Sequence, residues 1–209
     1  MISLTGTDLL MVAQWLSPSS PTGGFSFSQG LEAAVSDGLD VSGLEDWIDG
    51  MLRFGSGRTD AILMASAARG EEVDDLALAL AGSAGRRREL TETGAALQLL
   101  LRDSFALETA ATAYPVVLGE AVRVRGLPVE PVAALYLQAT VTALVHAGQR
   151  LLPLGQSRAQ AMIHALGAVC CEIAEEAARS DIEEIGMATF SADIAAMRQA
   201  ELPVRLFRS

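Results

Sequence analysis

Lysine is missing from this sequence of 209 residues: all 15 basic residues are arginine, and 26 acidic residues give a formal net charge of −11. A P-loop that cradles nucleotide phosphates needs a lysine, so the chain is not a P-loop GTPase. A nucleic-acid-binding surface needs clustered cations, and the only basic run is Arg86–Arg88, which we interpret as a helix start or an exposed face. The sequence therefore argues against a nucleic-acid partner.

Cysteine and histidine are also scarce, with two residues of each. Cys170 and Cys171 are neighbours whose side chains would point about 100° apart in a helix, so they form neither a usual disulfide nor a chelating pair. The lack of a disulfide framework predicts a cytoplasmic protein. His146 and His164 lie on separate predicted helices, and we expect no metal site made by this chain alone.

Catalytic patterns are absent as well. The sequence has no Gly-x-Ser-x-Gly elbow and no evident Cys-His pair. We therefore predict that the chain is not an enzyme, has no catalytic residues and binds no cofactor by itself.

Targeting and membrane signals are also missing. No basic region precedes an apolar core at the N-terminus, so we expect no signal peptide. The longest uncharged stretch, residues 131–149, contains glutamine, threonine and histidine. It predicts a central buried helix rather than a membrane span.

Strand-like alternation is nearly absent, whereas apolar residues recur at helical spacing along almost the whole chain. We predict an all-α fold: a single-domain helical bundle of about eight to ten helices over residues 1–209, with a short flexible C-terminal tail. Ser42 with Glu45, and Ser157 with Gln160, match the capping box that begins a helix. The predicted helices cover residues 7–15, 29–35, 42–55, 59–68, 86–113, 116–124, 131–151, 157–179 and 192–199, and a further helix begins at the acidic residues 71–75.

Residues 15–32, the signature segment, form a non-periodic stretch with two prolines and two adjacent glycines. Such residues demand a specific backbone path. Phe25 and Phe27 lie two residues apart in it, and a plain linker does not need two aromatic rings. Two interpretations stay open: both rings fold back into the core while Glu32 begins or caps a helix, or one ring, for which we choose Phe25, lies at a protein interface.

The C-terminal residues 199–209 are non-periodic too. Arg205–Arg208 alternates charge and apolar area, a pattern suited to docking on a partner as an extended peptide, with guanidinium groups binding carboxylates. A disordered end with incidental hydrophobic residues is the alternative.

Three parts of the chain resemble the urease accessory protein UreF family. The first is the run Ser-Pro-x-x-Pro-x-Gly-x-aromatic-Ser-x-Ser-x-Gly-Leu-Glu of the signature segment, and the second is Pro-Leu-Gly-Gln-x-x-x-Gln within residues 152–160. The third combines residues 192–198 with Arg205-Leu-Phe-Arg-Ser at the end. The matches lie in the family's order and span nearly the whole chain.

The resemblance implies a helical, non-enzymatic adaptor. Members of the family work with UreD (also called UreH) and the GTPase UreG, and help to deliver nickel to apo-urease; we expect a homodimer. Gln160 keeps two possible roles, in the capping box and in partner contacts. The partner-binding positions that the resemblance implies are Phe25, Ser26, Ser28, Glu32, Gln160, Ala188, Asp193, Arg205, Leu206, Phe207, Arg208 and Ser209.

The tail departs from the family pattern in two places. Gln199 replaces a common histidine, and Pro203 stands where a tyrosine is frequent. These departures affect individual contacts rather than the match at Asp193 and Arg205. Two other functions remain open: a regulator that activates UreG by supplying an arginine in trans, and a helical enzyme or ligand-binding bundle unrelated to urease.

Overall fold

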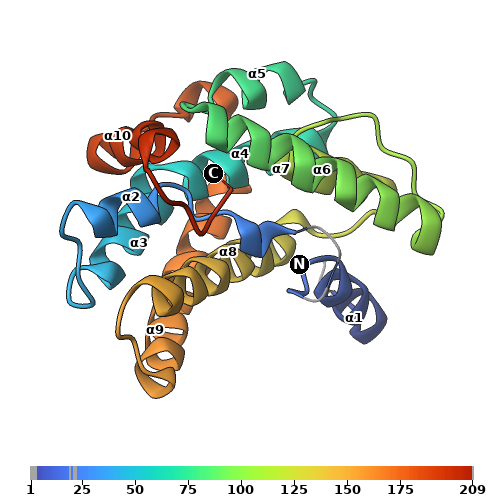
Figure 1. The fold of residues 1–209 in the computed structure, drawn as a ribbon. Helices are drawn as coiled ribbons and strands as arrows, with labels where there is room; N and C mark the ends of the chain where they lie inside the picture. The colour runs from blue at the N-terminus through green and yellow to red at the C-terminus, as the bar shows by residue number, and fades with distance from the viewer. Residues whose placement is uncertain (1–3, 19, 21–22, 209) are drawn as a thin grey trace.

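The computed structural model describes residues 4–18, 20 and 23–208, with Phe25 described by its backbone alone. This part of the chain contains ten α-helices and three short 3-10 helices and no β-strand, which confirms the predicted all-α fold (Figure 1). In chain order the elements are α1 (Gly6–Trp15), η1 (Gly24–Ser26), α2 (Leu31–Ser36), α3 (Leu44–Phe54), α4 (Ser56–Arg69), α5 (Asp74–Ala79), α6 (Ala84–Phe105), α7 (Tyr114–Arg125), α8 (Val129–Leu151), α9 (Gln156–Ala177), η2 (Ile182–Glu184), α10 (Phe190–Arg198) and η3 (Gln199–Glu201).

Helix α4 lies in the middle of the fold. Every residue from Thr59 to Ala67 is buried, as expected for a helix covered on all sides. Helix α7 approaches it closely at Gly119, where an added Cβ would lie 2.4 Å from the carbonyl oxygen of Met64. Helices α3, α8 and α9 also pack against α4.

Helices α8 and α9 form a helical hairpin joined by residues 152–155. By length and composition α8 could cross a membrane, but half of its most apolar stretch is buried within the fold. Val141, Leu144 and Val145 are among its enclosed residues. The prediction of a central buried helix therefore holds for the inner side of α8, while its outer side is partly exposed.

The prediction of one helix over residues 86–113 is wrong. Helix α6 ends at Phe105, and Ala106 follows in the left-handed region with φ of 52°. Residues 107–113 form an irregular connection in which Leu107 and Ala113 are nevertheless buried. Apolar spacing could not reveal this break, because a buried connection shows the same pattern as a helix.

Side chains from three helices satisfy the backbone of this connection. Asp74 of α5 accepts hydrogen bonds from the amides of Thr112 and Ala113 at 2.9 and 2.8 Å. Glu120 of α7 accepts from the two preceding amides at 2.7 and 3.1 Å. Gln98 of α6 donates to two of its carbonyls. Asp74 thus begins α5, as the acidic cluster predicted, and also holds the connection.

The predicted capping box at Ser42 does not form. Helix α3 begins at Leu44 after Gly43, without a side-chain cap. Asp40 instead binds the Ser42 hydroxyl at 2.5 Å, together with two backbone amides. These bonds, above all the one from the hydroxyl, lower the pKa of the Asp40 carboxyl. The local turn competes successfully with the cap for Ser42.

The second predicted capping box, Ser157 with Gln160, is also absent. Helix α9 begins one residue earlier, at Gln156, and its N-cap Gly155 has no side chain to offer. Gln160 is exposed in the second turn of the helix. Its side chain is therefore not used for capping.

Candidate partner-binding site

The signature segment folds against α10. Gln29 and Gly30 both have positive φ, 51° and 88°, and this turn brings the backbone close to the helix. A Cβ on Gly30 would lie 2.6 Å from the amide nitrogen of Ala196. Only glycine allows the chain to pass this close to α10, so Gly30 is a packing requirement of this fold.

The two phenylalanines of the segment were given two possible environments. Phe27 is buried, which agrees with the core interpretation for that ring. The side chain of Phe25 lies outside the described residues. The prediction that Phe25 contacts a partner therefore stays a prediction.

Glu32 binds the end of the chain. Its carboxylate is buried and accepts hydrogen bonds from the amides of Leu206 at 2.7 Å and Phe207 at 3.2 Å. The side chain of Gln199 donates to it at 3.4 Å, and the Ser28 hydroxyl donates to Gln199 at 3.0 Å. Glu32 lies in the first turn of α2, as expected, but its carboxylate holds the tail rather than capping the helix.

The tail packs on the body of the protein through Arg208 rather than extending as the predicted flexible end. Phe207 is only 3% exposed, and the Arg150 guanidinium lies 4.3 Å from the centre of its ring. The amide of Arg208 donates to the carbonyl of Ser26, and its guanidinium pairs with Glu92 at 3.0 Å. The physical reason is the hydrophobic effect, because removing the ring of Phe207 from water lowers the free energy of the folded state. Figure 1 shows the tail lying beside the signature segment.

Glu92 of α6 is the partner of Arg208 in the tail. Arg88 donates a hydrogen bond to its carboxylate, and Arg208 adds a favourable charge. The hydrogen bond from Arg88, and to a smaller degree the charge of Arg208, lower the pKa of Glu92. The Glu92 carboxylate is therefore ionised at neutral pH, as its ion pair with Arg208 requires.

Ala188 and Asp193 lie next to this tail-binding region. The amide of Ala188 donates to the carbonyl of Phe54 at 2.8 Å, which ties the start of α10 to the end of α3. Asp193 accepts a hydrogen bond from Thr189 at 3.3 Å and is half-buried. Helix α10 packs on α2, so both residues share the region of Glu32.

Helix α10 presents an apolar stripe to the outside. Phe190, Ile194 and Met197 are 74%, 54% and 53% exposed, at the i, i+4 and i+7 spacing of one helix face. Leu206 of the tail and Phe54 of α3 are also exposed. The stripe is a candidate protein-binding surface, because single exposed apolar residues are normal whereas a contiguous apolar patch marks an interaction site.

The predicted site residues thus fall into two groups. The signature segment, α2, α10 and the tail bring together Ser26, Ser28, Glu32, Ala188, Asp193, Arg205, Leu206, Phe207 and Arg208. Gln160 is separate, exposed on α9, which packs on α8, α3 and α4. Ser209 lies outside the described residues.

A buried ionic cluster was missed by the sequence interpretation. Arg86 is not on an exposed face: its guanidinium pairs with Asp60 of α4 and, at 2.7 Å, with Glu89 of α6. Tyr136 of α8 donates to Asp60, and Gln29 donates to Glu89 at 3.0 Å. Nothing in the local sequence distinguishes Arg86 from Arg87 and Arg88, because only packing against α4 decides which one is enclosed.

Burial and the neighbouring charges shift the pKa values of both Arg86 and Tyr136. Burial alone lowers the pKa of Arg86, but the charges of Asp60 and Glu89 outweigh it and raise that pKa well above its usual value. For Tyr136, burial and the neighbouring Asp60 together raise the pKa of the phenol. The cluster connects the signature segment, through Gln29, to the central helix.

A second feature of the segment is a cavity of about 260 Å³ between it, α6 and α8. Phe27, Tyr136, Ala143, His146 and Arg150 are among its lining residues. Its lining is mixed: apolar side chains alternate with polar and charged ones such as Glu89 and Thr140.

Known proteins with similar sequences decide the family. The family model described as UreF matches residues 39–167, more than half of the chain. A urease accessory protein UreF from Cereibacter sphaeroides (strain ATCC 17025 / ATH 2.4.3) is 45% identical, over 96% of this chain and 98% of the relative. The chain belongs to the UreF family of urease accessory proteins.

Further UreF relatives match over the same extent. The urease accessory protein UreF of Jannaschia sp. (strain CCS1) is 43% identical over 96% of this chain and 94% of the relative. That of Brucella ovis (strain ATCC 25840 / 63/290 / NCTC 10512) is 43% identical over 97% and 95%. The family that the three sequence motifs indicate is therefore confirmed, and the matches over 96–97% of the chain extend beyond the central helices to α10.

Proposed function

We propose that this UreF-family chain is a cytoplasmic, non-enzymatic adaptor that assembles with UreD and the GTPase UreG and supports insertion of nickel into apo-urease. Nickel is cargo of the assembled complex in this proposal, not a cofactor of the chain. Membership in a family of urease accessory proteins supports the proposal. The observation that carries it is the exposed apolar stripe of α10 beside the tail.

The stripe has the composition of an interface centre. Phenylalanine, isoleucine and methionine supply apolar area, and burying one such side chain is worth about 1.5–3 kcal/mol. The exposed guanidinium of Arg205 in the tail and the half-buried carboxylate of Asp193 on α10 suit a polar rim. We assign this surface to UreD.

Co-expression tests the assignment. Ile194→Asp should abolish co-purification with UreD and activation of urease in cells, because a charge would be buried in the contact. Val124→Asp is the matched control, since Val124 is equally exposed on α7, away from the stripe. Retained UreD binding by a folded Ile194→Asp protein would contradict the assignment.

We further propose that the chain forms a homodimer through α1. Leu9 and Leu10 are exposed on this short helix, and Leu10 is 74% exposed. Figure 1 shows α1 at the opposite side of the molecule from α10. Self-association through α1 would leave the α10 stripe available to UreD.

The proposed coupling to UreG depends on differential binding. A ligand shifts a switch only if it prefers one state, so the adaptor should bind one nucleotide form of UreG more tightly than the others. The affinity of UreG for the complex with UreD should therefore differ between GTP, GDP and no nucleotide. Equal affinities would rule out the coupling.

A second candidate is activation of UreG by an arginine supplied in trans. Arg86 cannot serve, because it is enclosed by carboxylates. Arg123, Arg125 and Arg205 are exposed and form no ion pair with any residue that the structure describes. Replacing each by alanine in a UreG turnover assay separates the candidates: an activator loses about 10³-fold or more in rate, whereas an adaptor loses only assembly.

A further inference from the structure

Gln29, in the middle of the signature segment, has a backbone conformation that glutamine seldom adopts. Its φ of 51° lies in the left-handed region, which it shares with one other non-glycine residue of the described chain, Ala106. A side chain costs free energy in this region, and such a residue persists only where the surrounding structure holds it. The contacts of Gln29 must therefore offset this strain.

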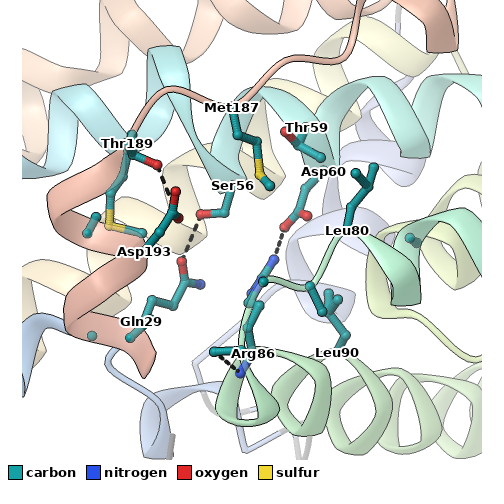
Figure 2. Close-up of a pocket in the computed structure, with 18 of the residues that line it drawn as sticks. Gln29, Ser56, Thr59, Asp60, Leu80, Arg86, Leu90, Met187, Thr189 and Asp193 are labelled. Carbon is teal, nitrogen blue, oxygen red and sulfur yellow. Dashed lines mark hydrogen bonds and ion pairs between the residues drawn. The ribbon is translucent and has the colours of Figure 1, made fainter. Parts of the chain in front are cut away.

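Both ends of the Gln29 side-chain amide are bound, by partners on two different helices. Its nitrogen donates to Glu89 of α6 at 3.0 Å, and its oxygen accepts from the hydroxyl of Ser56, the first residue of α4, at 3.0 Å. Figure 2 shows the amide directed at Ser56, beside the pair of Arg86 and Asp60. Glu89 is fixed in turn by its ion pair with Arg86. These two hydrogen bonds, the Gln29 clamp, fasten the signature segment to α4 and α6.

The neighbours of Gln29 contact other elements, namely α10, η3 and the tail. Every second residue from 26 to 32 does so: Ser26, Ser28, Gly30 and Glu32. Ser28 donates to Gln199, which is fully buried where α10 ends. Gly30 lies so close to α10 that a Cβ would not fit. The segment therefore joins the core, through the Gln29 side chain, to α10 and the tail, through the residues around it.

We propose that Gln29 is a positioning residue for partner docking: its clamp to α4 and α6 fixes the turn on which α10 and the tail are seated. The inference rests on the proposed function, in which the α10 stripe binds UreD. Without the clamp the turn leaves its strained conformation, and the contacts of Gly30 and Glu32 with α10 and the tail loosen. Docking then weakens, because binding must also order these elements.

An exchange of amide and carboxylate within the clamp tests the proposal on the full-length chain alone. Gln29→Glu places a second carboxylate beside Glu89, and at about pH 8 the two repel each other. We expect hydrogen exchange of the α10 amides and of Leu206 and Phe207 to accelerate about tenfold or more, while exchange in α4 stays unchanged.

Adding Glu89→Gln to Gln29→Glu should reverse the effect. In this double variant the amide and the carboxylate have changed places, so a donor again faces an acceptor and the charge of the pair is that of the parent chain. Glu89→Gln alone completes the double-mutant cycle. Recovery of slow exchange in α10 distinguishes the clamp from a general loss of stability, which a second substitution at the same place would only increase.

Two further variants serve as controls. Gln156→Glu makes the same charge change at the exposed start of α9 and should leave exchange in α10 unchanged. Gln29→Gly keeps the positive φ accessible but removes both hydrogen bonds, so it should loosen α10 and the tail. Parent-like exchange in a folded Gln29→Gly or Gln29→Glu, or no recovery in the double variant, would overturn the proposal.

Co-purification with UreD separates this inference from the proposed function. Gln29→Glu should reduce the recovery of UreD, and the double variant should restore it. If Ile194→Asp abolishes UreD binding but Gln29→Glu binds UreD like the parent chain, the stripe is the interface and Gln29 does not position it. If Ile194→Asp retains UreD, the assignment of the stripe is wrong, and hydrogen exchange alone decides whether the clamp holds α10 and the tail.

Discussion

At the residue scale, two buried polar groups hold distant parts of this chain together. The Glu32 carboxylate accepts hydrogen bonds from two amides of the tail. In the core, the Asp60 carboxylate accepts a hydrogen bond from Tyr136 and pairs with Arg86. In both cases a polar group is removed from water and given partners far away in the sequence. Each partner is therefore needed, because an orphaned buried group costs more than a hydrogen bond gains.

Glu32→Gln tests the attachment of the tail. The substitution keeps the shape but removes the charge that two backbone amides share, so we expect a loss of about 1–3 kcal/mol in the local stability of residues 199–208. Hydrogen exchange of the Leu206 and Phe207 amides should accelerate, whereas that of α4 should not change. Equal protection of these amides in both proteins would show that Glu32 does not hold the tail.

The raised pKa of Tyr136 predicts that the folded state becomes less stable at alkaline pH. Its pKa is raised in the folded state, whereas an unfolded tyrosine ionises near pH 10, so only the unfolded chain releases the proton as the pH rises above about 10. Stability is complete below that pH and should fall by roughly 1.4 kcal/mol from this group by pH 11. Urea unfolding at pH 9 and 11 measures the change.

Tyr136→Phe is the control for that experiment, because the variant retains Tyr114 and Cys170, whose pKa values burial also raises, the latter to about 12. The difference between the two proteins isolates the phenol. If both lose stability equally between pH 9 and 11, Tyr136 is not the source.

At the scale of elements, close approach of backbones decides how the helices fit. Helix α6 meets the 107–113 connection at Gly94, where a Cβ would lie 2.0 Å from the carbonyl oxygen of Thr112. Gly50 in α3 has no such neighbour, since nothing lies within 4 Å of an added Cβ. The packing of the helices therefore requires a glycine at position 94 but not at position 50.

Gly94→Ala and Gly50→Ala form a matched pair. We expect Gly94→Ala to destabilise the protein by about 1–3 kcal/mol or more, because the connection must move. Gly50→Ala should stabilise it by about 0.5–1 kcal/mol through helix propensity. Urea unfolding with unchanged m-values measures both, and equal effects of the two changes would refute the packing argument.

At the scale of the whole molecule, most of the exposed large apolar residues lie on α1 and on α10 with the tail, whereas Phe54, Leu99 and Val124 lie on other helices. Two separate surfaces suit a protein that joins copies of itself and other chains. All basic residues are arginine, whose planar guanidinium group can bind a carboxylate through two hydrogen bonds, and the guanidinium of Arg205 in the tail is exposed.

Leu10→Asp tests the surface on α1. We expect the variant to be a monomer by light scattering while its helical content and its binding to UreD persist, because the changed side chain is solvent-exposed in one chain. Val124→Asp should leave the oligomeric state unchanged. A monomeric parent chain, or a dimeric Leu10→Asp, would exclude self-association through this helix.

The sequence sufficed for the all-α fold, for most helix positions and for the UreF family, because helical periodicity and the three motifs are local patterns. It also predicted partner contacts at the signature segment, in α10 and in the tail, and the structure places these three segments against one another. The helix starts at Ser42 and Ser157 were wrong by one or two residues, since Asp40 captures the first serine and Gly155 precedes the second helix.

Only the tertiary structure decided which groups are enclosed. Arg86 and its two neighbours are alike in sequence, but α4 places Asp60 against the first of them alone. Phe207 looks like part of a free end, but Glu32 and Arg150, far away along the chain, hold it inside. Periodicity records which residues share a face of a helix, whereas burial depends on what packs against that face, and this information comes from residues that are distant in the sequence.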